Sequence, residues 1–406
     1  MQLSEENYAH TFSRNKDDGF CFSLEKNKNE WVLNSGYYVG LTWLDKNKHA
    51  LLINPKLNNK NLLEPDKIQI DYYKMLFSCL QHPEVANEIE ELFEIKWDEP
   101  TISIENKEDV LTPFLIIQFL SLVKSIVRKG LKKSYYKVEK NLNSKVKGKV
   151  LIGSTIKHNL LKNKFLNTYC KYEEFGVNGL ENRLLKKTLH FINKYLPTRL
   201  KQNQFHYFEE TLNYISPAFE NVTDKIDLRE LKFTKNNAFF KEYDKAIRLA
   251  KIILKRFSYN ISNAVNEKIE THPFWIDMSK LFELYTLGLL KDRFGKDVKY
   301  HFTHYGNELD YILKSGELKM VIDAKYKQYQ KYKVANEDVR QVSGYARLEK
   351  VYDYLEKTYP DSINCLIIYP DIINGFDNLK SIQFENHPVK DYNGVFKLGV
   401  KLPLLN

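Results

Sequence analysis

The fold of this chain is indicated by one stretch, residues 308–326, with the sequence ELDYILKSGELKMVIDAKY. Apolar and polar residues alternate on both sides of a polar turn, which is the pattern of two antiparallel strands joined as a hairpin. A turn centred on Ser315 and Gly316 would place Asp310 opposite Val321. We therefore predict a β-hairpin with a buried face and a face that carries charged side chains.

The charged face of this hairpin carries the candidate chemistry. Side chains alternate between faces along a strand, so Asp323 and Lys325 would project together, with Asp310 diagonal to them at roughly 5 to 8 Å. Two such carboxylates repel unless a divalent cation neutralises them, and an oxygen-only ligand set favours Mg²⁺. Lys325 could then stabilise the charge that develops on a phosphate. The alternative is a solvated strand face with one salt bridge.

A buried helix is predicted before the hairpin, from about Asp277 to Phe294, with Asp277 as the N-cap. Apolar residues surround it, so the carboxylate of Glu283 would be desolvated unless it meets a metal ion, a cation or water. Glu283 is therefore a candidate third metal ligand. The alternative is an ion pair with Lys280 or Lys291.

A second helix is predicted after the hairpin, over residues 338–356. It places Gln341 and Tyr345 one turn apart on one face, where Gln341 could hydrogen-bond a phosphate or a carboxylate of the site. An apolar strand follows at residues 365–369. The order of helix, hairpin, helix and strand predicts an α/β core.

Several motifs together resemble one protein family. They are FWIDM (274–278) with LFELY (281–285), IDAKYK (322–327), QVSGYA (341–346) and, upstream, YYVG (37–40), INPK (53–56), residues 130–150 and NGLEN (178–182). In this order they resemble the McrC family, the endonuclease subunits of McrBC-type restriction systems, with a PD-(D/E)XK nuclease fold. The chain departs from that pattern at Glu308-Leu309-Asp310, where the Pro that often precedes the Asp is absent, so Glu308 is a competing ligand.

The resemblance implies a Mg²⁺-dependent endonuclease acting on double-stranded DNA. It assigns catalytic roles to Asp310, Asp323, Lys325, Glu283 and Gln341, with Asp310, Asp323 and Glu283 at the metal. It also implies a ring-forming McrB-like AAA+ GTPase as partner, which the chain would engage through its N-terminal part and stimulate. The sequence has no G-x-x-x-x-G-K-[ST] phosphate loop, so nucleotide hydrolysis would belong to that separate partner.

Charge divides the chain into three segments. Residues 1–110 have 12 basic against 20 acidic residues, residues 111–270 have 31 against 14, and residues 271–406 have 19 against 18. We predict an acidic partner-docking module, a basic DNA-facing region and a nuclease domain, respectively. The candidate phosphate contacts in the basic region are Lys145, Lys147 and Lys149, which alternate along a probable strand, with Arg128, Lys132 and Lys133.

The predicted fold class is multidomain α/β. The pattern indicates a β-rich N-terminal module, a mainly helical middle region and the C-terminal α/β nuclease core. The four cysteines have no paired spacing, so we expect buried thiols and neither disulfides nor zinc. No stretch approaches roughly eighteen uninterrupted apolar residues, and the first residues do not resemble a signal peptide, so we expect a cytoplasmic protein without a membrane partner.

Two other functions remain open from the sequence. One is a self-sufficient PD-(D/E)XK nuclease, which would cleave DNA without nucleotide or partner. The other is a non-catalytic activator of a GTPase ring, in which the nuclease fold serves only as a scaffold. The presence of Asp310, Asp323 and Lys325 together argues against this last function.

Overall fold

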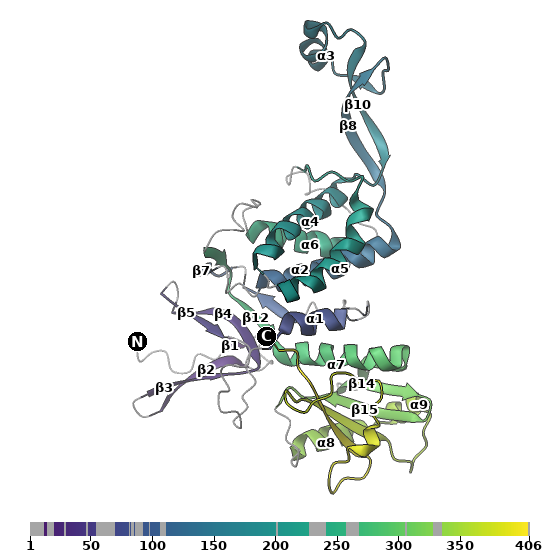
Figure 1. Cartoon of the computed structure of the whole chain (residues 1–406). Coiled ribbons are helices and arrows are strands. Elements are labelled where there is room, and N and C mark those ends of the chain that lie inside the picture. The colour runs from purple at the N-terminus through teal and green to yellow at the C-terminus, as the bar shows by residue number, and fades with distance from the viewer. Residues whose placement is uncertain are drawn as a thin grey trace. The chain divides into compact units, whose positions relative to one another are not determined.

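The computed structural model divides into two compact units (Figure 1). One contains residues 1–104 and 270–406, and the other contains residues 105–269. Within them the structure describes residues 12–13, 20–27, 30–45, 48–53, 70–80, 82, 85, 92–96, 98–105, 111–199, 202–226, 241–256, 268–304, 307–327 and 335–404. Both helices and sheets occur in each unit, so the α/β class is confirmed.

A five-stranded sheet forms the core of the first unit. Its strands are β13 (Val298–His304), β14 (Asn307–Ser315), β15 (Leu318–Ala324), β16 (Asn364–Pro370) and β17 (Val395–Val400), in that order across the sheet. The pairs β13–β14 and β14–β15 are antiparallel, whereas β15–β16 and β16–β17 are parallel. The predicted hairpin and the apolar strand are therefore confirmed.

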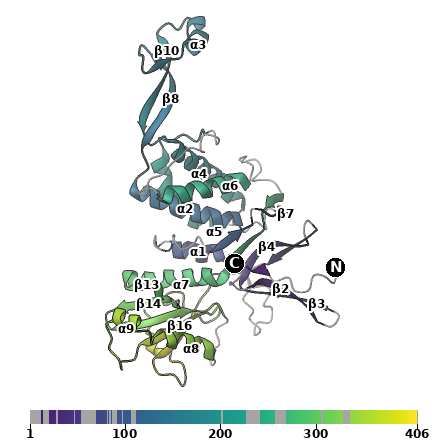
Figure 2. The ribbon, with the colours of Figure 1, turned by 180° about the vertical axis from the view of Figure 1, so that it is seen from behind.

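Helices cover both faces of this sheet (Figure 2). On one face lies α7 (Met278–Phe294), whose Glu283 carbonyl accepts a hydrogen bond of 2.6 Å from the Tyr311 hydroxyl. Helices α8 (Asn336–Tyr345) and α9 (Glu349–Leu355) pack on the other face, around Ile312 and Val321. A single helix over 338–356 was wrong, because the chain leaves the helix between Tyr345 and Glu349.

The predicted cap of α7 is confirmed, since the Asp277 side chain accepts a hydrogen bond from the Lys280 amide at 3.0 Å. Helix α1 (Tyr72–Leu80) packs against α7 within the same unit. Gly288 makes this approach possible, because a Cβ there would lie 3.0 Å from the Cα of Cys79. Cys79, Cys170 and Cys365 are buried free thiols, as expected; the side chain of Cys21 lies outside the described residues.

The N-terminal strands belong to this unit too. A four-stranded sheet has the order β5 (His49–Ile53), β4 (Tyr38–Asp45), β12 (Phe274–Asp277) and β6 (Phe93–Ile95). A three-stranded sheet contains β1 (Phe12–Ser13), β2 (Phe20–Asn27) and β3 (Glu30–Ser35). Because β12 pairs with β4 and β6, the first and third charge segments share one sheet. The short strands β7 (Ile102–Glu105) and β11 (Lys268–Thr271) pair where the chain passes between the units.

The second unit is built around helix α2 (Leu111–Lys129). The other long helices of this unit are α4 (Leu180–Arg199), α5 (Gln202–Ile215) and α6 (Lys241–Arg256), and a 3-10 turn η5 (Ser216–Phe219) follows α5. Helix α2 is long and apolar enough to cross a membrane by length and composition alone. However, 13 of its residues are buried, and it packs against α4, α5 and α6, so it is the core helix of this bundle.

A β-structure extends from the helices of this unit, with α3 at its far end (Figure 1). Strands β8 (Ser134–Asn143) and β10 (Asn167–Gly176) pair over ten residues each, and β9 (Lys149–Val150) pairs with β10. Helix α3 (Ile152–His158) and the turn η4 (Leu160–Lys162) connect β9 to β10. The middle region is therefore not simply helical, because alternating residues in 134–143 and 167–176 favour strands there.

Candidate functional site

The hairpin register sets the geometry of the candidate site. Ser315 pairs with Leu318 and Ile312 pairs with Val321, so the turn residues are Gly316 and Glu317. The predicted placement of Asp310 opposite Val321 was wrong by two residues. Gly316 explains the shift. Its φ of +57° suits a tight two-residue turn, and residues with a side chain rarely adopt this positive φ.

This register brings Asp310 level with Asp323, just beyond the last paired residues of the hairpin. The two strands separate there because Oδ2 of Asp310 accepts a hydrogen bond of 2.7 Å from the Ala324 amide. A side chain thus takes the place of a backbone partner. The two carboxylates lie across from each other rather than one diagonal apart.

Both carboxylates lie in an environment that opposes their charge. Burial raises the pKa of Asp310 well above its usual range, and the charges of Asp323 and Glu283 raise it further. Burial also raises the pKa of Asp323, which is only 1% exposed. Its Oδ2 faces the ammonium of Lys325, and no described backbone amide donates to either carboxylate oxygen. Such oxygens are costly to bury unless a cation meets them.

Lys325 supplies one nearby positive charge. Its Nζ lies 2.8 Å from Oδ2 of Asp323, as a largely buried ion pair. Burial alone lowers the pKa of Lys325, but the charges of Asp323, Asp310 and Asp338 outweigh burial and raise it. The ammonium therefore stays protonated beside the two carboxylates, and it neutralises one negative charge of the two.

Glu283 has partners of its own. Its Oε1 accepts a hydrogen bond of 2.7 Å from the Tyr300 hydroxyl and lies 3.0 Å from Nε2 of His301. It also lies 3.5 Å from Nζ of Lys280, so of the two alternative ion pairs the structure shows the one with Lys280. Burial raises the pKa of Glu283, but these partners outweigh it and lower the pKa. The Nζ of Lys291 instead donates to the carbonyl of Val298 at 3.4 Å.

The sequence prediction did not include His301. Its Nε2 contacts Glu283 and its Nδ1 lies 3.0 Å from Oε1 of Glu308, so one ring joins the two competing acidic candidates. The side chain of Glu308 is 53% exposed. His301 has a φ of +50°, which lies in the left-handed region that alternating strand patterns do not anticipate. His301 lies between Tyr300 and Phe302, which pair with Tyr311 and Leu309, so its position across from Asp310 was the signal that could have found it.

Helix α8 brings further polar groups to the sheet. The Gln341 amide donates to the Tyr345 hydroxyl at 2.9 Å, so the predicted pairing on one helix face is confirmed. The sequence pattern indicates Asp338 only as the start of this helix, but its carboxylate is buried and accepts hydrogen bonds from Tyr369 at 3.0 Å and Lys327 at 2.8 Å. The charge of Asp338 also acts on Asp323 and Lys325, so the local excess of negative charge is larger than predicted.

The donor set fits a hard divalent cation held by two carboxylates. Among the described residues, no three His, Cys, Asp or Glu side chains are placed to enclose a metal ion by themselves. Mg²⁺ often takes only one or two protein carboxylates and completes its shell with water and phosphate oxygens. Asp310 and Asp323 could therefore supply the ligand oxygens, whereas Glu283 is already engaged by Tyr300, His301 and Lys280.

The basic candidates of the second unit differ in their surroundings. Arg128, Lys133, Lys145, Lys147 and Lys149 are exposed. The ammonium of Lys132 instead lies 2.7 Å from Oε1 of Glu181, with both side chains largely buried, which favours a structural role over a phosphate contact.

The predicted strand through Lys145, Lys147 and Lys149 was wrong in its extent. Only Lys149 and Val150 form a strand, because Gly148 has a φ of +68° and ends the extended run. The ammonium of Lys147 lies 4.2 Å from the centroid of the Tyr172 ring and 3.5 Å from Glu174. The three lysines thus lie on the exposed surface, with Lys145 and Lys147 in the loop that precedes β9.

Residues 33–370 match the model of the family described as the McrBC 5-methylcytosine restriction system component. The chain is similar, at 17% identity, to a half-complex from a tetradecameric assembly of Thermococcus gammatolerans McrB AAA+ hexamers with bound McrC. That match covers 93% of this chain and 80% of the other, with a TM-score of 0.38.

A second match is the cryo-EM structure of the Thermococcus gammatolerans McrBC complex, at 17% identity and a TM-score of 0.28, covering 71% of this chain and 74% of the other. No curated protein matches the chain. The family match spans most of the sequence and includes the hairpin with its two carboxylates. The chain therefore belongs to the McrC family of McrBC restriction system components.

Proposed function

We propose that this chain is a Mg²⁺-dependent DNA endonuclease, the cleaving subunit of an McrBC-type and modification-dependent restriction system. The observation that carries the proposal is the pair of buried carboxylates, Asp310 and Asp323, with the ammonium of Lys325 2.8 Å from the second. This arrangement on a hairpin of an α/β core, within an McrC-family chain, supports a PD-(D/E)XK nuclease core.

Asp310 and Asp323 would hold the Mg²⁺ ion, which supplies an activated water and polarises a phosphate oxygen when bound. Burial excludes bulk water from these two carboxylates and strengthens their interaction with a cation. Lys325, held protonated by its acidic neighbours, would donate to a phosphate oxygen as negative charge develops there. Gln341 is exposed on α8, where its amide can orient a phosphate or a water.

Glu283 supports this site in a different way from a direct ligand. Its carboxylate is held by Tyr300, His301 and Lys280, and its charge raises the pKa of Asp310. The proposed role is to fix α7 against β13 and to add negative potential that favours a cation. A direct ligand role for Glu283 or Glu308 stays a prediction, and substitution of each residue alone would distinguish the two.

The basic second unit would hold the DNA. Residues 111–270 carry 31 basic against 14 acidic residues, and the exposed lysines 145, 147 and 149 offer phosphate contacts that do not depend on base sequence. The double-stranded substrate is therefore proposed to be bound through its backbone. Recognition of a modified base would belong to another component.

The proposed partner is a ring-forming McrB-like AAA+ GTPase. Membership of the McrBC family supports a partner protein, and the sequence contains no phosphate loop of its own. McrC is bound to McrB AAA+ hexamers in the Thermococcus gammatolerans assembly. We place the complex in the cytoplasm, where DNA and GTP are both available.

A cleavage assay with the cognate AAA+ protein tests the proposal. The assay uses modified plasmid DNA with GTP, in Mg²⁺ or in chelator, and compares the wild-type chain with Asp310→Asn and Glu317→Gln. We expect cleavage only in Mg²⁺, loss of cleavage in Asp310→Asn, and normal cleavage in Glu317→Gln, since Glu317 lies in the exposed hairpin turn.

The same samples separate the alternatives. GTP hydrolysis by the partner should rise equally with the wild-type chain and with Asp310→Asn, because cleavage and partner stimulation are proposed to use different surfaces. Cleavage without nucleotide or partner would instead favour a self-sufficient nuclease. Stimulated hydrolysis without any cleavage by the wild-type chain would favour a non-catalytic activator.

A further inference from the structure

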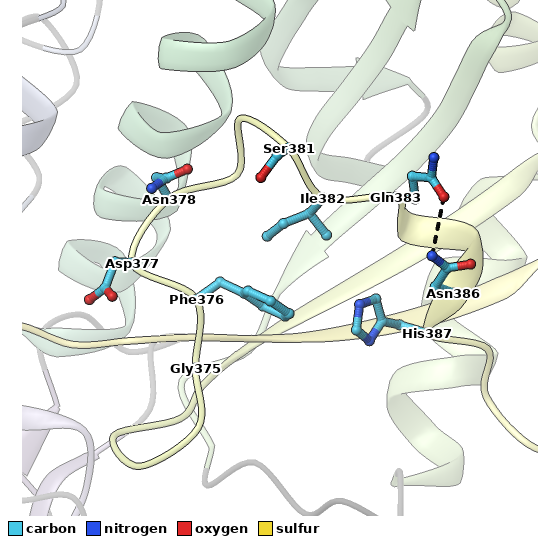
Figure 3. Close-up of a pocket in the computed structure, with 9 residues that line it drawn as sticks. All are labelled: Gly375, Phe376, Asp377, Asn378, Ser381, Ile382, Gln383, Asn386 and His387. Atoms are coloured by element: carbon cyan, nitrogen blue, oxygen red, sulfur yellow. Dashed lines mark hydrogen bonds between the residues drawn. The ribbon is translucent and has the colours of Figure 1, made fainter.

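A surface cavity of about 440 Å³ lies beside the edge strand β17 (Figure 3). Its lining residues all come from one segment, 375–387, which follows β16 and contains the short 3-10 helix η10 (Phe384–Asn386). The volume lies within the range of roughly 300–1,000 Å³ that is usual for small-molecule sites. None of the residues assigned above to the metal site lines this cavity.

Arg293 on α7 holds the segment that forms the cavity. One guanidinium nitrogen of Arg293 on α7 donates to the carbonyls of Leu379 and Ile382, at 2.8 and 2.6 Å. The guanidinium also lies over the rings of Phe294 and Phe384, 4.5 and 4.9 Å from their centroids. Leu379 and Phe384 are each only 1% exposed. These contacts hold the segment in one conformation, so the cavity does not depend on a loop that is free to collapse.

Two rings border the cavity, and backbone hydrogen bonds to β17 hold the two residues that carry them. The amide of Phe376 donates to the Gly399 carbonyl at 2.9 Å, and the His387 carbonyl accepts from the Lys397 amide at 2.9 Å. The rings of Phe376 and His387 meet edge to face, with centroids 5.4 Å apart. Phe376 is nonetheless 37% exposed, and both rings border the space beneath Ile382 (Figure 3). An exposed ring held in this way offers a face for a planar ligand.

The remaining lining is polar and carries little positive charge. Its hydrogen-bonding side chains are Asn378, Ser381, Gln383 and Asn386. The Asn386 amide donates to the Gln383 oxygen at 3.2 Å, so these two carboxamides are oriented together. The lining contains no Lys or Arg, and its single carboxylate, Asp377, lies 3.8 Å from Nζ of Lys401 outside it. A phosphate finds no cation here, whereas a neutral ligand with several donors and acceptors does find partners.

We propose that this cavity binds an unpaired nucleobase, stacked against Phe376 and hydrogen-bonded by the carboxamides of Gln383 and Asn386. Bases are neutral and planar, and their edges present donors and acceptors that Asn and Gln match. Stacking requires that the base be free of its duplex partner, as at a strand end or in a single strand. The inference rests on the proposed function, because DNA cleavage brings such ends to this protein.

A fluorescent base tests this site directly. The probe is a single-stranded oligothymidylate of about ten nucleotides with one 2-aminopurine, mixed with the full-length chain in chelator so that no cleavage occurs. Stacking on a protein ring quenches 2-aminopurine, so we expect quenching that saturates with protein. The Phe376→Leu variant, which keeps an apolar side chain but removes the ring, should bind the probe base about tenfold more weakly.

Matched variants keep the test decisive. Tyr359→Leu removes an aromatic ring that is 85% exposed and does not line the cavity, so its quenching should equal that of the wild-type chain. Asn386→Asp preserves the size of the side chain but replaces a donor with a negative charge, and it should also weaken quenching. It serves as the second test if Phe376→Leu unfolds at a lower temperature.

Three outcomes would overturn the proposal: no quenching by the wild-type chain, equal quenching by Phe376→Leu, or equal quenching by Asn386→Asp. A positive result is checked with a 5-iodouracil oligonucleotide, whose photocrosslink should map to residues 375–387. Failure of the proposed function is distinguishable, because a chain that cannot cleave in Mg²⁺ can still quench the probe in chelator. Conversely, normal cleavage without quenching would reject only the base-binding cavity.

Discussion

The carboxylate site on β14 and β15 and the basic strands β8 to β10 hold their charges under opposite conditions. Asp323 is 1% exposed and lies 2.8 Å from the ammonium of Lys325, whereas Lys145, Lys147 and Lys149 are exposed to water. A buried charge costs free energy until a ligand meets it, but a solvated charge costs little and gains little. The first region therefore indicates one specific ligand, and the second indicates a diffuse anionic surface.

Substitution of Asp323 should have the largest effect on DNA cleavage. A small effect would contradict the difference drawn above between the carboxylate site and the basic strands. We expect Asp323→Ala to lower DNA cleavage by roughly 10²- to 10³-fold or more, since it removes a ligand of the proposed metal ion. Stability should hardly fall, because the substitution relieves repulsion with Asp310. The measurement is a single-turnover cleavage rate in Mg²⁺. Glu317→Gln, in the exposed turn of the same hairpin, is the control that should keep normal activity.

Lys132 tests whether the basic region is uniform. Its ion pair with Glu181 is largely buried, and Asn182 links the same region to Tyr243 by a hydrogen bond of 2.7 Å. We expect Lys132→Ala to lower the free energy of unfolding by about 2 to 3 kcal/mol. The neighbouring Lys133→Ala should change it by no more than about 0.5 kcal/mol. Urea denaturation provides both values, and weaker DNA binding at unchanged stability would instead assign Lys132 to phosphate.

The exposed lysines should affect binding rather than stability. Replacing Lys145, Lys147 and Lys149 with Gln together should weaken DNA binding similarly for unrelated sequences. It should also flatten the dependence of log affinity on log salt by up to about 0.9 per lost phosphate contact. Fluorescence anisotropy at several salt concentrations measures both. A control triple variant at exposed lysines of the first unit, Lys296, Lys350 and Lys390, should leave the slope unchanged. Equal slopes for the two triple variants would show that β9 and its preceding loop are merely solvated.

The pH dependence of stability should give the smallest effect. Asp310 and Asp323 have a raised pKa in the folded state. Their contribution to the free energy of unfolding is therefore fully present at low pH and is lost as pH rises through the raised pKa. Without divalent cations, Asp310→Asn should therefore be more stable than the wild-type chain by about 1 to 2 kcal/mol at pH 7 and by little at pH 4. Denaturation curves at both pH values measure this difference.

Two further comparisons sharpen this result. Addition of Mg²⁺ at pH 7 should stabilise the wild-type chain more than Asp310→Asn, since the ligand binds the folded state. Glu283 acts in the opposite direction, because its lowered pKa gives stability that is lost as pH falls through the folded value. An identical response of the wild-type chain and Asp310→Asn to pH and to Mg²⁺ would remove the basis for a strained carboxylate pair.

Much of the fold was predictable because local patterns agree with it. The alternation around the turn predicted β14 and β15, the apolar surface of residues 278–294 predicted a buried helix, and Asp277 was identified as its cap. The register was not predictable from alternation alone, since a shift of two residues leaves the same side chains on the same face. The observed pairing of Ser315 with Leu318, around a turn with Gly316 at positive φ, placed Asp310 across from Asp323.

Residues far apart in sequence were harder to assign. Nothing near Phe274 indicates that β12 pairs with β4, so the shared sheet of the first and third segments depends on contacts between chain segments over two hundred residues apart. Deletion of residues 1–110 would therefore remove β4 and β6, the two strands that pair with β12. The partners of Glu283 likewise come from β13, and Asp338 joins Tyr369 only when α8 packs on the sheet.

The sequence by itself determined the chemistry of this protein: which residues are carboxylates, which segments alternate, where the basic excess lies, and which family the motifs resemble. The tertiary structure decided the electrostatic state of those residues. Burial raises the pKa of Asp310 and Asp323, three partners satisfy Glu283, and Glu181 engages Lys132. The physical reason is that the sequence specifies which side chains can carry a charge, but the solvation and the partners of each side chain depend on what the fold packs around it.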